Sequence, residues 1–166
     1  MITTIHSLLH SESARDAVTV AGWVRTRRDS KEFSFIELND GSCLANLQIL
    51  VEAACPDYGR VGSVTTGAAI RVEGELVASP GKGQRWEVRA RRLQLVGPAP
   101  EDFPLQKKRH TDEFLRTIAH LRPRTNKYGA MFRIRARLAH AVHEFFHQRG
   151  FYWIHTPIIT GADCEG

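Results

Sequence analysis

The stretch GWVRTRRDSKEFSFIELNDG, residues 22–41, contains the pattern that decides the fold of this 166-residue chain. Apolar and polar residues alternate along 18–27 and again along 33–38, which predicts two half-buried β-strands. Asp40-Gly41 supplies the positive-φ turn of a hairpin that leads into a third strand at 44–50. The alternation therefore predicts an antiparallel sheet at the start of the chain.

Two further strands follow at 68–78 and 85–96, joined by the turn-forming loop SPGKGQ at 79–84. Pro56 and Gly59 interrupt the segment between the third and fourth strands, so we expect one short helical turn there. A first helix at 4–10 is capped by the Thr3 or Thr4 side chain. Five strands with a helical element between the third and fourth predict an OB-fold, a five-stranded Greek-key barrel.

The remainder of the chain reads as helical after a proline-rich linker at 97–104. One helix begins at the capping Thr111 and ends before Pro123, and a longer one occupies 126–149 with Gly150 as its stop. A strand-like apolar run then covers 151–159. The apolar face of the long helix consists of Met131, Ile134, Leu138, Ala141, Val142 and Phe145.

This order predicts three parts: a barrel at 1–100, a helical hinge at 101–126, and the start of a second unit at 127–166. A long amphipathic helix and an apolar strand must bury their faces, and few residues follow them. We therefore expect the second unit to be cut short, as the front of a larger α+β domain. The other possibility is that this segment packs back on the barrel.

Several functional classes are excluded by composition. No apolar run approaches the ~18 residues of a membrane span, so no membrane partner is expected. The first residues have neither a basic n-region nor an apolar h-region, as a secretory signal would. The three cysteines, Cys43, Cys55 and Cys164, lie far apart and fit free thiols in a reducing compartment. We predict a cytoplasmic location.

Positive charge is concentrated in one segment. Residues 107–137 hold ten Lys/Arg against two Asp/Glu, whereas residues 1–106 hold twelve against thirteen. This cluster begins with Lys107, Lys108 and Arg109. Such asymmetry indicates a polyanionic partner, although a solvated basic face without a ligand remains open.

The opening stretch combines arginines with aromatic residues, which suits single-stranded nucleic acid. The arginines are Arg25, Arg27 and Arg28. Phe33 and Phe35 project from one side of their strand. Phe35 is expected to be exposed because Ile36 and Leu38 supply the core set, whereas Phe33 fits the core and the surface equally well. Gln48 on the paired strand could bind a base edge or serve only solubility.

The remaining motifs give weaker indications of function. SPGKGQ joins two strands and lacks the Lys-Ser/Thr ending of a phosphate-binding P-loop, so we read it as a hairpin tip with Lys82 near a backbone phosphate. His140, His143 and His147 share a helix, but no HExxH motif or nearby cysteine accompanies them, so no metal site is expected. No nucleophile–base pair or carboxylate pair stands out, and no catalytic residue is predicted.

Three quoted stretches together carry a family resemblance: residues 22–48, the loop SPGKGQ, and PLQKKRHTDEFLRTIAHLRPRTN at 104–126. They resemble the asparaginyl-tRNA synthetases, in the aspartyl/asparaginyl/lysyl subclass of class II synthetases. The run FFHQRGFYWIHTPIITGADCEG at 145–166 resembles class II motif 1 and the residues after it. Glu32 departs from the small residue common at that turn. The 107–126 segment is the most specific part of the resemblance.

The resemblance implies roles for particular residues. The barrel would bind the anticodon, with Phe35 stacking on its middle base and Gln48 and the three arginines contacting base edges and phosphates. Residues 107–124 would pass near the tRNA body. Pro157 would lie at a homodimer interface, and Glu165 would hold the α-ammonium group of the amino acid.

The resemblance also implies the chemistry of a whole enzyme, in which ATP and Mg²⁺ activate asparagine before transfer to tRNA(Asn). Motifs 2 and 3 of class II synthetases do not occur in these 166 residues, so we expect this chain alone to be inactive and to bind no cofactor. Two other functions remain open. One is an aspartyl- or lysyl-type synthetase, and the other is a freestanding OB-fold protein that binds single-stranded nucleic acid.

Overall fold

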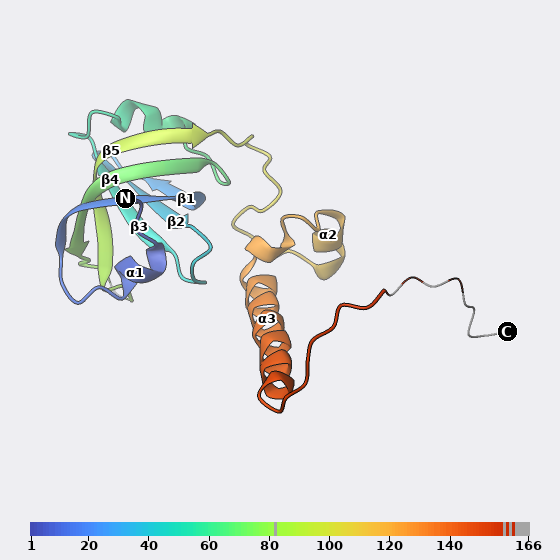
Figure 1. The fold of residues 1–166 in the computed structure, drawn as a ribbon. Coiled ribbons are helices and arrows are strands. Elements are labelled where there is room, and N and C mark those ends of the chain that lie inside the picture. The colour runs from blue at the N-terminus through green and yellow to red at the C-terminus, as the bar shows by residue number, and fades with distance from the viewer. Residues whose placement is uncertain (82, 158, 160, 162–166) are drawn as a thin grey trace.

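The computed structural model describes residues 1–81, 83–157, 159 and 161. Its first part is a closed barrel with the strand order β1-β2-β3-β5-β4 (Figure 1). The strands are β1 (Arg15–Asp29), β2 (Phe33–Asn39), β3 (Leu47–Glu52), β4 (Ala69–Ala78) and β5 (Trp86–Gly97). Neighbouring strands are antiparallel except for β3 and β5, which pair in parallel. The predicted OB-fold is confirmed.

The barrel core follows from the alternation in the sequence. In β2 every second residue is buried, and Ile36 and Leu38 have no exposed surface. Ile49 of β3, Val72 of β4 and Val88 of β5 are likewise fully buried. The opposite side chains of β2, including Phe33 and Phe35, lie on the outer surface at intermediate exposure. Phe35 is therefore outside the core, as the sequence predicts.

Helix α1 (Ile5–Leu9) packs on the barrel through Ile5 and Leu8, which are fully buried. Its N-cap is Thr4, whose side chain accepts a hydrogen bond from the Ser7 backbone. A carboxylate oxygen of Asp40, in the turn after β2, accepts from the Ile5 N–H at 2.8 Å. The turn thus holds the start of α1. Burial opposes ionisation of Asp40, but hydrogen bonds from the Ser42 hydroxyl and from backbone N–H groups keep its pKa below the ordinary value.

The turn after β2 differs in length from the predicted one. Gly41 has the expected positive φ of 82°, a conformation that glycine adopts without strain. However, β3 begins at Leu47 rather than at residue 44. The Asn39 side chain donates to the carbonyls of Cys43 and Ala45, which takes these residues out of the strand ladder. The predicted helical turn between β3 and β4 is present as a short 3₁₀ helix, η1 (Tyr58–Ser63).

The hinge contains a helix and a small core of its own. Helix α2 (Asp112–Thr117) has the predicted N-cap Thr111 but ends six residues before Pro123, and a 3₁₀ turn, η2 (Arg122–Arg124), follows. Leu105, Leu115 and Tyr128 are buried together, with partly buried apolar neighbours around them. The barrel and the hinge therefore have separate hydrophobic clusters.

Helix α3 (Asn126–His147) extends away from the barrel, and Gly150 ends it with a φ of 84°, as predicted (Figure 1). The large side chains of its predicted apolar face are all exposed: Met131, Ile134, Leu138, Val142 and Phe145. Among the described residues no helix is long and apolar enough to cross a membrane.

The predicted strand at 151–159 does not form: residues 151–157 and 159 have no assigned secondary structure. A strand needs a neighbour to accept its backbone hydrogen bonds, and the barrel strands pair only with one another in the part of the chain that the structure describes. Phe151, Trp153 and Ile154 are correspondingly exposed.

Candidate nucleic-acid interface

Two rows of side chains cross the outer face of β1, β2, β3 and β5. Strand register pairs Arg28 with Phe35, Phe35 with Leu50, and Leu50 with Arg89. The neighbouring row pairs Glu37 with Gln48 and Gln48 with Glu87. Because paired residues in a sheet share a face, the two rows place aromatic, cationic and amide groups side by side.

The first row offers a flat aromatic surface with a cation above it. The rings of Phe33 and Phe35 meet edge to face with centroids 5.0 Å apart. The guanidinium carbon of Arg28 lies 5.8 Å from the centroid of the Phe35 ring, within the range of a cation–π contact. Both phenylalanines are only half-buried, so a flat ligand can stack on them.

The second row is organised by a buried carboxylate. Glu87 is 4% exposed, and its Oε2 accepts hydrogen bonds from Gln48 Nε2 at 2.9 Å and from Ser79 Oγ at 2.8 Å. Gln84 Nε2 donates to Ser79 Oγ at 2.7 Å and to Glu87 at 3.4 Å. Because the Gln48 amide nitrogen is held by Glu87, its carbonyl oxygen is available to accept a hydrogen bond from a base.

Sequence reasoning missed Glu87. It lies between Trp86 and Val88, so the alternation of β5 places it on the outer face. What brings it to Gln48 is the parallel pairing of β3 with β5, which joins residues 39 positions apart. No local pattern in the sequence reveals that pairing.

Arg27 does not reach the aromatic row. It pairs with the buried Ile36, and its Nη1 donates to the carbonyls of Val61, Gly62 and Val64 at 2.6, 2.9 and 3.0 Å. Its Nε also lies 3.2 Å from a carboxylate oxygen of Asp29. These contacts attach η1 to β1, which gives Arg27 a place in the barrel structure.

Arg25 also points elsewhere. Val24 pairs with Leu38 and Thr26 with Glu37, so Arg25 is the extra residue of a β-bulge in β1. Its Nη1 donates to the backbone carbonyl of Arg124 in the hinge, at 2.5 Å. Of the three arginines in the opening stretch, only Arg28 therefore lies beside Phe35.

The basic segment at 107–109 is exposed on the hinge. Lys108 and Arg109 line an open cavity of about 710 Å³, together with Asp112 and Lys127. Lys127 donates to Asp112 at 2.6 Å, and this hydrogen bond lowers the pKa of Asp112 and raises that of Lys127. Asp112 and Lys127 thus form an ion pair, and Lys107, Lys108 and Arg109 stay exposed beside it.

Three predicted site residues remain: Pro157, Lys82 and Glu165. Pro157 is exposed, beyond the end of α3. Lys82 and Glu165 lie outside the described residues, so their predicted roles stay predictions.

Comparison with known proteins gives two family matches. Residues 18–96 match the OB-fold nucleic acid binding domain, and residues 111–166 match the class II tRNA synthetases (D, K and N). The two rows of side chains described above all fall within the first match.

Individual relatives are similar in sequence to this chain over nearly its whole length. The chain is 61% identical to an asparagine–tRNA ligase of Oleidesulfovibrio alaskensis and 60% identical to that of Nitratidesulfovibrio vulgaris, over 99% of its own length in each case. It spans 36% of the length of these relatives.

A solved structure, the asparaginyl-tRNA synthetase of Pyrococcus horikoshii complexed with asparaginyl-adenylate, matches with a TM-score of 0.84. The match covers 95% of this chain and 37% of that one at 21% identity, and supports the fold. Over nearly its whole length the chain is therefore similar to asparagine–tRNA ligases, and it matches the OB-fold and class II tRNA synthetase family models in succession.

Proposed function

We propose that this chain is the anticodon- and tRNA-binding part of an asparagine–tRNA ligase, an enzyme that activates asparagine with ATP and transfers it to tRNA(Asn). The observation that carries the proposal is the pair of rows on the barrel, in which Arg28 and Phe35 lie beside Gln48 and Glu87. This arrangement is suited to one unstacked base and its phosphate.

The proposed binding mode follows from the chemistry of each group. A base stacks on the Phe35 ring, while the Arg28 guanidinium reaches the phosphate beside it. Gln48 accepts a hydrogen bond from the edge of the base, because Glu87 holds its amide nitrogen. Phe33 extends the stacking surface, and Lys82 of the SPGKGQ loop contacts a further phosphate.

The basic hinge segment binds the tRNA body in this proposal. Lys107, Lys108 and Arg109 are exposed, and backbone phosphates are the partner that exposed cations on a tRNA-binding protein would contact. These contacts add affinity without selecting a sequence, whereas the barrel reads the anticodon.

The segment after the hinge would belong to the catalytic domain. We propose the division 1–100 for the barrel, 101–126 for the hinge and 127–166 for the start of that domain. The exposed apolar face of α3 and the exposed Pro157 support a homodimer interface at this place, because large apolar patches on proteins are usually covered by a partner. Glu165 would bind the α-ammonium group of asparagine.

We propose that a ligase binds ATP and Mg²⁺ through residues outside the described part of this chain. No three His, Cys, Asp or Glu side chains converge there in a way that could hold a metal ion. We assign both cofactors to other parts of a ligase and derive no step through them. We also propose a cytoplasmic location, which the free thiols of Cys43 and Cys55 support.

The test joins this chain to the remaining length of the Oleidesulfovibrio alaskensis ligase. Residues 1–166 alone should give no asparagine-dependent exchange between ATP and pyrophosphate, whereas the joined protein should give exchange and should charge tRNA(Asn). The tRNA that the joined protein charges shows which tRNA this chain selects, because the amino acid pocket comes from the relative.

The competing functions predict different results. An aspartyl- or lysyl-type chain would direct the joined protein to tRNA(Asp) or tRNA(Lys) instead. A freestanding OB-fold protein would bind single strands with no preference among the three tRNAs. Exchange by residues 1–166 alone would contradict the assignment of catalysis to other parts of the ligase.

A further inference from the structure

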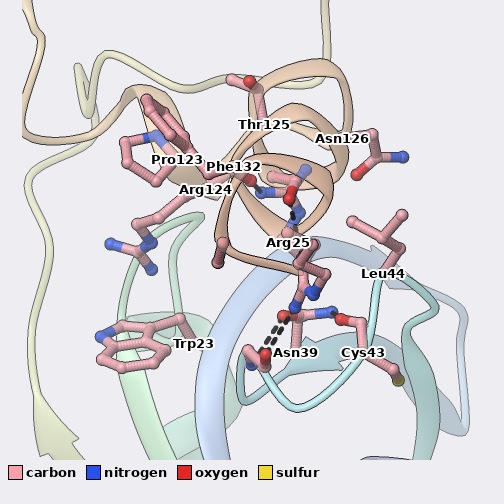
Figure 2. A pocket seen from close by; sticks show the side chains of 14 residues that line it. Trp23, Arg25, Asn39, Cys43, Leu44, Pro123, Arg124, Thr125, Asn126 and Phe132 are labelled. Carbon is pink, nitrogen blue, oxygen red and sulfur yellow. Dashed lines mark hydrogen bonds between the residues drawn. The ribbon is translucent and has the colours of Figure 1, made fainter. Parts of the chain in front are cut away.

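The barrel and the hinge meet in a joint, which we define as the contacts that Trp23, Arg25 and Gly41 of the barrel make with Arg124 and Arg133. Figure 2 shows this region as an open cavity with Arg25 at its centre and Trp23 and Arg124 at one side. Its volume is about 460 Å³, and its lining comes from both the barrel and the hinge with the start of α3.

Three contacts link the barrel to the hinge and to α3, and each side supplies at least one of the guanidinium groups. Arg25 donates to the carbonyl of Arg124, at the end of η2 and directly before the N-cap of α3. The Arg124 guanidinium lies over the Trp23 ring of the barrel, 4.8 Å from its centroid. About two turns into α3, Arg133 Nη2 donates to the carbonyl of Gly41 at 2.6 Å. Together these contacts fix the position and the direction of α3.

The linker adds a fourth contact. Phe103 packs on the barrel at Gly67, where an added Cβ would come within 2.6 Å of the Phe103 ring. Gly67 also has a φ of 91°, which side-chain-bearing residues rarely adopt. The Arg124 guanidinium lies 5.6 Å from the Phe103 ring as well, so linker, hinge and barrel share one contact region.

Arg25 lies in a partly buried cluster of guanidinium groups. Burial lowers the pKa of Arg25, against the attraction of Glu37, and burial together with the nearby Arg25 lowers the pKa of Arg124. The cavity lining contains Arg25, Arg124 and Arg133 but no carboxylate. Two guanidiniums are thus held close together in a partly desolvated place. The direct backbone hydrogen bond and the aromatic contacts are what offset this cost.

We propose that Arg25 is a positioning residue rather than an RNA contact: the bulge in β1 aims its guanidinium at the Arg124 carbonyl, and this bond docks α3 on the barrel. Arg25 also lines the cavity that Lys108 and Arg109 border, so the docking sets where the basic segment faces relative to Phe35. The barrel and α3 form one body through this joint.

The docking is tested without RNA by measuring a distance between nitroxide labels. Labels at Asp16→Cys on β1 and Arg137→Cys on α3, both exposed positions, are placed in a chain whose native cysteines are replaced. The chain with the wild-type joint should give one narrow distribution of label-to-label distances, and Arg25→Ala should increase the width of this distribution at least about twofold. Arg25→Lys keeps a hydrogen-bond donor, so the width in this variant should be close to that of the wild type.

Two matched variants control for folding and for charge. Arg28→Ala removes an arginine three residues away on the same strand and should leave the distribution unchanged. On α3, Arg133→Ala should broaden the distribution, whereas Arg135→Ala, which lacks a joint contact, should not. The circular dichroism and melting of each variant confirm a folded barrel. A distribution for Arg25→Ala as narrow as that of the wild type would overturn the proposal.

A second readout rests on the proposed function. With the joint loosened, the anticodon face and the basic segment no longer bind one tRNA as a preformed pair, so whole-tRNA(Asn) affinity should fall on the order of tenfold in Arg25→Ala. Affinity for the isolated anticodon hairpin should stay within about twofold. An equal loss for the hairpin would identify Arg25 as a direct contact and refute the positioning role. A wild-type chain that binds neither RNA would overturn the proposed function, and the distance measurement would still decide the role of Arg25.

Discussion

Replacing Phe35 by alanine separates a stacking role from a core role, because the two roles predict opposite results. In the structure the ring is half-buried on the outer face of β2, touching Phe33 edge to face and lying near the Arg28 guanidinium. Phe35→Ala should weaken binding of the tRNA(Asn) anticodon hairpin by roughly 1–3 kcal/mol, the usual contribution of one stacked base. This corresponds to about a 5- to 150-fold rise in Kd.

The cost to stability can be worked from the same contacts. The lost aromatic pair contributes about 0.5–1.5 kcal/mol and the lost cation–π contact about 0.5–1 kcal/mol. These two contributions sum to about 1–2.5 kcal/mol, and the apolar area that the half-buried ring covers adds to them. Since only part of the ring is buried, the loss of unfolding free energy should stay near or below the lower end of the ~3–5 kcal/mol expected for a phenylalanine removed from a core.

Ile36→Ala is the matched control for this experiment. Ile36 is the next residue on the same strand but has no exposed surface, so its truncation should cost about 2–5 kcal/mol of stability. Hairpin affinity of its folded fraction should not change. Urea unfolding and fluorescence titration of a labelled hairpin measure both quantities. A large loss of stability in Phe35→Ala with unchanged hairpin affinity would refute the stacking role.

Three further predictions concern charge and association. Lys107→Ala or Arg109→Ala should each reduce the slope of log K against log salt for whole-tRNA binding by roughly 0.7–0.9, with little effect on the hairpin; an unchanged slope would place these residues away from phosphates. The folded-state pKa of Asp40 is lowered, so its stabilisation is present above its unfolded pKa and is lost as the pH falls through the folded one. The unfolding free energy should therefore fall between about pH 5 and pH 3, and this fall should be smaller in Asp40→Asn; equal curves for the two proteins in urea titrations would contradict that role. Leu138→Glu should shift sedimentation toward the monomer if the exposed face of α3 is a dimer interface, and a wild-type chain that is monomeric at high concentration would argue against it.

Most of the barrel could be predicted because strand alternation is a local property. Ile36 and Leu38 identify the core face of β2, and that assignment places Phe35 outside without knowledge of any other strand. Helix caps are equally local, and Thr111 begins α2 as predicted. The strand predicted at 151–159 was wrong because a strand depends on a neighbour, which the sequence of the strand does not supply.

The arrangement of the site was harder to predict, for two physical reasons. A bulge at Arg25 changes the phase of β1, so that Arg28 rather than Arg25 or Arg27 pairs across from Phe35. The parallel pairing of β3 and β5 brings Glu87 to Gln48 over a long sequence separation. Both depend on register, which alternation alone does not fix.

The surface on which RNA meets the barrel is measured most directly by backbone amide chemical shifts. The chain is titrated with the tRNA(Asn) anticodon hairpin and, separately, with the same hairpin carrying a changed middle base. We predict that the largest shift changes fall on Arg28, Phe33, Phe35 and Gln48, and that they saturate only with the unchanged hairpin. Shift changes centred on the opposite β4–β5 surface, or identical changes with both hairpins, would contradict the assignment of this face as an anticodon reader.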